Sequence, residues 1–129
     1  MPIRLDHTTI AAHDARASAE FLAAVLGLEV GEPMGPFTPI VLANGVTLDF
    51  YETHDAADRG GHFAFLVSEE EFSAGLAHLQ ATDVTYYPGP TLAHPGEINT
   101  RDGGRGLYFL DPVGHTMELL TVPYGGRPD

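Results

Sequence analysis

The sequence contains no cysteine, no lysine and no tryptophan, and only six of its 129 residues are basic. Without cysteine the chain cannot form disulfides, thiolate zinc sites or iron–sulfur clusters, and it has no thiol nucleophile. The six basic residues, all arginine, stand against 18 acidic residues, which gives a formal net charge of -12. Nucleic-acid phosphates and anionic membrane surfaces require clustered lysine or arginine, so we expect neither as a partner.

Long apolar runs are also missing. No stretch approaches the ~18 consecutive apolar residues of a membrane-spanning helix. Residues 1–7 hold no basic region followed by an apolar one, so a secretory signal is not predicted. We therefore expect a cytoplasmic protein. Apolar residues make up 43% of the chain, which is enough to fill the core of a single domain over residues 1–129.

The pattern of apolar residues and turn signals predicts the same order of elements twice. A strand, a helix and three further strands are expected over about residues 1–53 and again over about 61–123. Each helix has a start signal: Asp14 is an N-cap residue, and Ser68 opens a capping box. Residues 124–129 are expected to be frayed. Two such βαβββ modules predict an α+β fold.

Two finer expectations depend on single segments. In the first module, residues 29–31 are predicted to begin a strand that returns from the helix, ahead of a hairpin at Asn44-Gly45. In the second module, His115 is predicted to be a turn residue of the last hairpin.

Each module carries, at matching positions, a histidine in its first strand and a carboxylate in its last strand. These are His7 and Asp49 in the first module, and His62 and Glu118 in the second. If the modules pair by pseudo-twofold symmetry, the four side chains converge. Converging carboxylates repel one another and lose hydration unless a cation lies between them. Two imidazoles with one or two carboxylates suit Fe(II), Mn(II), Ni(II), Co(II) or Zn(II), so a divalent-metal site is predicted.

Four segments carry a resemblance to a known family: residues 5–10, 21–28, 61–65 and 106–119. The last contains the run Asp-Pro-Val-Gly-His-Thr-Met-Glu-Leu, which is the most specific. On these segments the sequence resembles the vicinal oxygen chelate superfamily, which includes glyoxalase I, extradiol dioxygenases, fosfomycin-resistance thiol transferases and bleomycin-resistance proteins. The resemblance covers nearly the whole chain. It implies that the two modules form a cupped mixed sheet around a divalent metal, with the helices outside.

The resemblance also implies roles for individual residues. His7, His62 and Glu118 match the three ligands common to the metalloenzymes of the superfamily. Asp49 falls where members similar to glyoxalase I place a fourth ligand, a glutamate. Because aspartate is one methylene shorter, both direct ligation and contact through water remain open. Glu118 and Asp49 are also the candidate catalytic residues, as carriers of protons.

Two functions from different classes follow from the resemblance. The first is a metal-dependent lyase, dioxygenase or thiol transferase that chelates two neighbouring oxygens of a small molecule and stabilises an oxyanion. Thiol chemistry would then need an external thiol. The alternative is a metal-free protein of the bleomycin-resistance type that sequesters a drug, for which the acidic surface would favour a cationic ligand. The presence of His7, His62 and Glu118 speaks against this alternative. A third reading is a structural partner domain with a vestigial site.

Substrate recognition is expected from two segments rich in proline and glycine, residues 32–39 and 88–105. The candidate substrate-binding residues are three aromatic residues and two arginines: Phe37, Tyr51, Tyr108, Arg101 and Arg105. A surface ion pair is the alternative role for each arginine. The resemblance implies a homodimer. Whether His7 meets His62 and Glu118 of its own chain or of the other subunit is left open.

Overall fold

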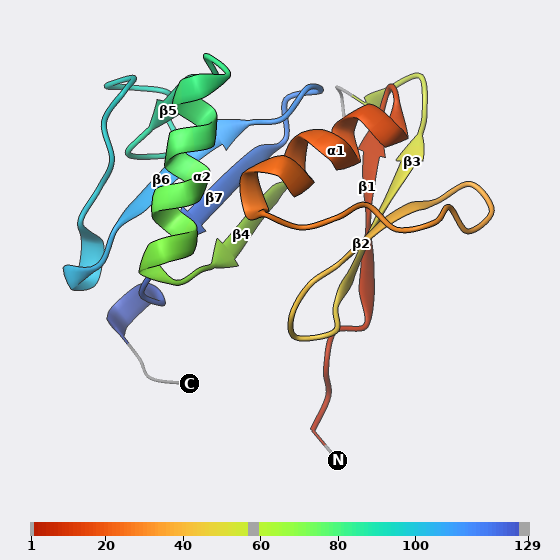
Figure 1. Cartoon of the computed structure of the whole chain (residues 1–129), viewed down its shortest axis with the longest axis horizontal. Helices are drawn as coiled ribbons and strands as arrows, with labels where there is room; N and C mark the ends of the chain where they lie inside the picture. The colour runs from red at the N-terminus through yellow and green to blue at the C-terminus, as the bar shows by residue number, and fades with distance from the viewer. Residues whose placement is uncertain (1, 57–59, 127–129) are drawn as a thin grey trace.

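The computed structural model describes residues 2–56 and 60–126. It contains two α-helices and two mixed β-sheets, which confirms the α+β prediction (Figure 1). The first module comprises β1 (His7–Ala12), α1 (Ala15–Leu26), β2 (Thr38–Val41) and β3 (Thr47–Glu52). The second comprises β4 (His62–Leu66), α2 (Glu69–Ala81), β5 (Tyr86–Tyr87), η2 (Arg101–Gly103), β6 (Gly106–Leu110), β7 (Thr116–Leu120) and η3 (Tyr124–Gly126).

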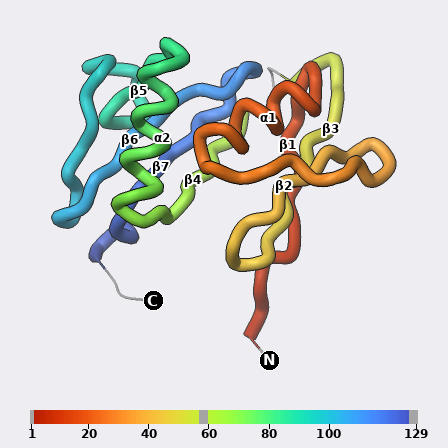
Figure 2. Tube along the Cα trace, viewed as in Figure 1, coloured from red at the N-terminus to blue at the C-terminus, as the bar shows by residue number. Residues whose placement is uncertain are grey.

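The two modules have related sheet topologies. The first sheet has the strand order β1-β3-β2, in which β1 and β3 are parallel and β2 is antiparallel to β3. The second has the order β4-β7-β6-β5, in which β4 and β7 are parallel and the remaining pairs are antiparallel. In both sheets the first strand of the module is an outer strand. Figure 2 shows β1 and β4 approaching each other at one end and diverging at the other.

Both helices begin where the sequence predicts. The Asp14 side chain accepts a hydrogen bond from the backbone N–H of Ala17 at the start of α1. At the start of α2, the Ser68 side chain and the Glu71 side chain each accept from the other residue's backbone N–H, which is the predicted capping box. Helix α1 ends at Gly27, whose φ of 71° is left-handed and suits glycine.

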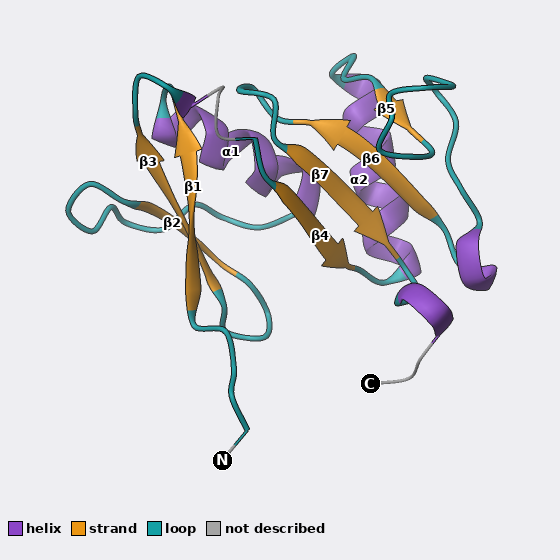
Figure 3. Cartoon of the chain, turned by 180° about the vertical axis from the view of Figure 1, so that it is seen from behind, coloured by secondary structure: helices purple, strands orange, loops and turns teal. Residues whose placement is uncertain are grey.

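The helices lie side by side and cover one face of the sheets, as the views from the two sides show (Figures 1 and 3). Gly75 of α2 lies at their contact, where a Cβ atom would be 3.0 Å from the backbone oxygen of Val25 in α1. Alternate strand residues fill the core beneath the helices, because successive side chains point to opposite faces of a sheet. The largest buried apolar side chains are Phe50, Phe72, Phe109, Ile10, Leu22, Ile40, Leu79, Leu107, Met117 and Leu119.

His115 joins the two modules. Its ring is 2% exposed, and its Nδ1 accepts a 2.8 Å hydrogen bond from the backbone N–H of Gly61, just before β4. Nδ1 therefore carries no proton, so Nε2 carries it and donates to the backbone oxygen of Ala11 in β1 at 2.7 Å. His115 is thus more than the predicted turn residue, since it ties the end of β1 to the start of β4.

The first module has three strands rather than the predicted four. Within the described residues no strand forms over 29–31; only the N–H of Gly31 bonds across, to the oxygen of Pro39. Pro33, Pro36 and Pro39 follow in this part of the chain and have no N–H to donate, which prevents a continuous ladder of hydrogen bonds. The segment 32–37 instead forms a loop closed by a bridge between Met34 and Phe37.

The other face of the two sheets is not covered by a helix (Figure 3). Where the modules diverge, a groove of about 530 Å³ separates them. Its lining is largely apolar and includes Leu26, Leu28, Leu42, Ala64, Leu66 and Val67.

Neither helix in residues 2–56 and 60–126 has the length and apolar character needed to cross a membrane.

Candidate functional site

The predicted ligands of the second module lie on the uncovered face of its sheet. His62 of β4 pairs with Thr116 of the parallel strand β7, and Glu118 follows two residues later on the same face. The Nε2 atom of His62 lies 2.9 Å from Oε1 of Glu118. The two side chains differ in burial, because Glu118 is 1% exposed whereas the imidazole of His62 is 48% exposed. A buried carboxylate therefore stands beside an accessible imidazole.

The first module repeats this register. His7 of β1 pairs with Thr47 of β3, and Asp49 follows two residues later. The shorter aspartate does not take the place that Glu118 has in the second module: Nδ1 of His7 lies 2.7 Å from Oδ2 of Asp6 instead. That hydrogen bond is the main reason why the pKa of His7 is raised, and the charge of Asp49 adds to the effect.

The four predicted ligands do not meet within one chain. In residues 2–56 and 60–126, no group of three or more His, Asp or Glu side chains is close enough to hold a metal ion. Only His62 and Glu118 are in contact, and the first sheet carries His7 and Asp49 separately. One chain therefore carries the predicted ligands as two separate pairs, one on each sheet.

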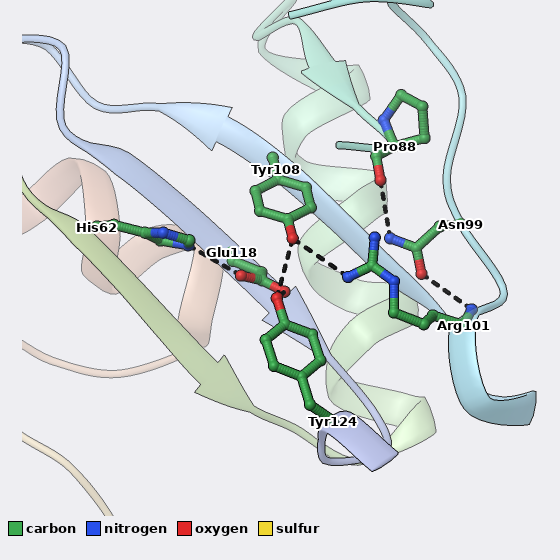
Figure 4. Close-up of polar contacts among 7 residues, drawn as sticks. All are labelled: His62, Pro88, Asn99, Arg101, Tyr108, Glu118 and Tyr124. Atoms are coloured by element: carbon green, nitrogen blue, oxygen red, sulfur yellow. Dashed lines mark hydrogen bonds and ion pairs between the residues drawn. The ribbon is translucent and has the colours of Figure 1, made fainter. Parts of the chain in front are cut away.

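Two phenols and an arginine surround Glu118 (Figure 4). The hydroxyl of Tyr124 donates a 2.6 Å hydrogen bond to Oε2 of Glu118. Because the proton of Tyr124 is used in this way, Tyr108 donates to the Tyr124 oxygen, at 3.0 Å. Nη1 of Arg101 lies 3.4 Å from the Tyr108 oxygen, and its guanidinium carbon lies 5.4 Å from the centroid of the Tyr124 ring.

This arrangement shifts the pKa of Tyr124. Burial of the phenol, followed by its hydrogen bond to Glu118, raises the pKa well above the usual range of tyrosine. Tyr124 therefore remains a hydrogen-bond donor to the carboxylate. The tail was predicted to be frayed, but residues 124–126 form a 3-10 turn and their tyrosine contacts the buried carboxylate. The predicted tail residues 127–129 lie outside the described part of the chain.

The remaining candidate substrate-binding residues occupy different places. Tyr108 lies on β6, with its ring centroid 5.8 Å from that of His62. Phe37 and Tyr51 form an edge-to-face pair in the first module, with centroids 6.5 Å apart. Arg105 bonds to α2: its Nε lies 2.8 Å from Oε1 of Glu69. The predicted candidates are thus divided between the two modules, and Arg105 forms the ion pair that was its alternative role.

Comparison with known proteins decides the family. Residues 4–119 match the glyoxalase/bleomycin resistance protein/dioxygenase superfamily. The chain belongs to this superfamily. The resemblance inferred from the sequence motifs is thereby confirmed.

Several known proteins are similar to this chain over most of its length. A glutathione transferase named FosA, from Serratia marcescens, is 30% identical over 122 residues, which cover 89% of this chain and 78% of that protein. The solved structure of the oxidase ChaP-H2 is 49% identical, covers 98% of both chains and has a TM-score of 0.94. The fosfomycin resistance protein FosX from Mesorhizobium loti shares the fold, with 20% identity, a TM-score of 0.69 and coverage of 94% of this chain and 93% of that one.

Proposed function

We propose that the protein is a divalent-metal-dependent enzyme that acts on a small molecule through two neighbouring oxygens of the substrate. The observation that carries the proposal is the pair formed by His62 and Glu118. Glu118 is almost fully buried and has a histidine and a tyrosine, but no lysine or arginine side chain, within bonding distance among the described residues. A buried carboxylate that bonds to no permanently charged side chain is costly, and a divalent cation held between Glu118 and His62 would offset that cost.

The side chains present fit such a metal. Imidazole nitrogen and carboxylate oxygen suit the first-row divalent metals Fe, Mn, Ni, Co and Zn. His62 and Glu118 are the proposed ligands in the second module, and His7 and Asp49 are the proposed ligands in the first. When bound, the metal supplies Lewis-acid charge that stabilises an oxyanion on the substrate. Glu118 and Asp49 are the residues of this set that can accept a proton.

We infer that two copies of the chain share each site. The first strand of each module, β1 or β4, lies at the edge of its own sheet, so each leaves backbone groups unpaired on one side. Leu66 on β4 is 52% exposed and lines the apolar groove between the modules. A second copy with its β1 beside β4 would cover this edge and bring His7 and Asp49 to His62 and Glu118. Twofold symmetry then produces two equal sites in a homodimer.

The same arrangement assigns the substrate contacts. Tyr108 and Arg101 lie next to Glu118, whereas Phe37 and Tyr51 belong to the module that the other subunit contributes. A substrate between the modules would meet aromatic surface from one subunit and hydrogen-bond donors from the other. Arg101 forms no ion pair with a carboxylate among the described residues, so its charge is available to an anionic or carbonyl oxygen of the substrate. The superfamily includes a similar oxidase and a similar glutathione transferase, which support small-molecule chemistry without selecting one reaction.

Mixing two inactive variants tests the shared site. His7→Ala and His62→Ala should each lose metal uptake when purified alone. If the subunits are mixed, unfolded and refolded together, half of the dimers are heterodimers, and each of these keeps one intact site. Metal content should then recover to about a quarter of an ion per chain, as twofold symmetry requires. The measurement is elemental analysis after removal of free metal.

A second mixture is the control. His62→Ala and Glu118→Ala remove ligands from the same module, so no heterodimer of these two variants has an intact site, and metal should stay absent. Recovery in neither mixture, with wild-type protein binding one metal per chain, would refute the shared site. Wild-type protein that takes up none of the five metals would overturn the enzyme proposal and leave a metal-free binding protein.

A further inference from the structure

The two oxygens of Glu118 have different partners. Oε1 lies 2.9 Å from Nε2 of His62, the proposed metal ligand, whereas Oε2 accepts the 2.6 Å hydrogen bond from Tyr124 (Figure 4). A carboxylate that uses one oxygen for a metal and the other for a donor binds the metal through a single atom. Carboxylates that are free of such a donor can turn and bind through both atoms.

Tyr124 is held in place from three directions. Tyr108 donates to its hydroxyl, and the guanidinium of Arg101 lies against its ring. The backbone N–H of Gly125 donates a 2.9 Å hydrogen bond to Oδ2 of Asp102 and so ties the C-terminal turn to the 3-10 turn that carries Arg101. The position of the phenol is therefore set before any ligand binds, which is what a residue that orients a metal ligand requires.

We propose that Tyr124 is a positioning residue that reserves Oε2 of Glu118 and leaves Oε1 as the only oxygen that ligates the metal. This inference rests on the proposed function. With Oε2 held by Tyr124, Oε1 is the oxygen that would face a metal held beside His62. Tyr124 acts through Glu118 and from outside the ligand set. Partners of this kind, which hold the ligands themselves, typically change metal affinity by about 10- to 100-fold.

Competition between Tyr124 and the metal for Glu118 would change metal affinity in the opposite direction from a positioning role. If Tyr124 competed with the metal for Glu118, its hydroxyl would have to be displaced on metal binding, and removing it would strengthen binding. A positioning role predicts weaker binding. The sign of the change in affinity therefore decides between the two.

The variant for the test is Tyr124→Phe, which removes only the hydroxyl. Tyr124 as a whole is 47% exposed and lies outside the core, although its hydroxyl is turned toward Glu118, so this change leaves the core intact. The matched control is Tyr86→Phe, which removes a phenol hydroxyl that accepts from Gln80 at 3.1 Å, away from Glu118. Affinity for Co(II) is measured by titration against a competing chelator, and the visible spectrum of the Co(II) protein reports the coordination geometry.

We expect Tyr124→Phe to bind Co(II) about 10- to 100-fold more weakly than wild type. Its visible spectrum should also change, because Glu118 is then no longer held in one orientation, while Tyr86→Phe should match wild type in both respects. Unchanged or tighter binding by Tyr124→Phe, with wild type binding normally, would overturn the inference and leave the proposed function standing. Failure of the wild-type protein itself to bind Co(II) or the other metals would instead refute the proposed function.

Discussion

Replacing His115 with phenylalanine tests the joint between the two modules. The change keeps a ring of similar size in a site that is 2% exposed, and it keeps the edge-to-face neighbour Phe63, whose ring centroid lies 6.0 Å away. It removes both hydrogen bonds of the imidazole, to the N–H of Gly61 and to the oxygen of Ala11. One backbone donor and one backbone acceptor are then left without partners.

The expected loss of stability follows from those two groups. An unsatisfied buried polar group costs about 1–3 kcal/mol, and Gly61 is only half-buried, so the two together should cost about 2–4 kcal/mol. With a urea m-value of about 2 kcal/mol/M, the middle of the range for small proteins, the unfolding midpoint should fall by about 1–2 M. The chain has no tryptophan, so circular dichroism and tyrosine fluorescence are the appropriate probes. Protein concentration must be matched, because dimerisation would contribute to the measured stability.

The control is His13→Phe, since His13 is exposed and should change stability by less than about 0.5 kcal/mol. Amide hydrogen exchange gives a second measurement, because the N–H of Gly61 should lose protection in His115→Phe. A loss below about 1 kcal/mol with unchanged m-value and unchanged exchange at Gly61 would refute the assignment of His115 as the joint.

Two further predictions concern other polar side chains of the second module. Burial raises the pKa of Asp111, so the unfolded chain loses this proton first as the pH rises, and stability falls until the folded pKa is passed. The variant Asp111→Asn has no proton to lose at this position. The difference in unfolding free energy between wild type and this variant should therefore be smaller at pH 7 than at about pH 4, and an equal difference at both pH values would contradict the raised pKa. Arg105→Ala removes an ion pair with Glu69 and a guanidinium 4.5 Å from the centroid of the Phe72 ring. The melting temperature of this variant should reveal a loss of about 1 kcal/mol in unfolding free energy, whereas loss of the exposed pair at Arg16 should cost no more than about 0.5 kcal/mol. Because Arg105 also donates to Ser73 Oγ at 2.7 Å, equal losses would argue against a contribution from its contacts with Phe72 and Ser73 together.

Much of the fold follows from local signals. Asp14 and Ser68 form the expected caps because an N-cap side chain needs only the N–H groups of the next turn. The strands follow the alternation of apolar and polar residues, which reports the two faces of a sheet directly. Residues 29–31 are predicted to begin a strand but do not form one. Segment 32–39, which follows them, contains three prolines and so lacks three of the backbone N–H groups that a ladder of hydrogen bonds needs.

The candidate site also has one part that the sequence predicts and another that depends on the tertiary structure. The sequence by itself determined which residue types stand at equivalent positions of the two modules, since His7 and His62, and likewise Asp49 and Glu118, occupy matching strands. It also determined the family, because the motifs are contiguous. The sequence alone therefore predicts which kinds of donor atom, imidazole nitrogen and carboxylate oxygen, a metal site would use.

Only the tertiary structure decided which of these residues meet. It places His62 against Glu118 and leaves His7 with Asp6, because the two sheets do not join within one chain. It also gives His115 a partner 104 residues away, and it brings Tyr124 onto the buried carboxylate. Contacts of this kind depend on how whole strands and turns are packed, and no short run of sequence encodes that packing.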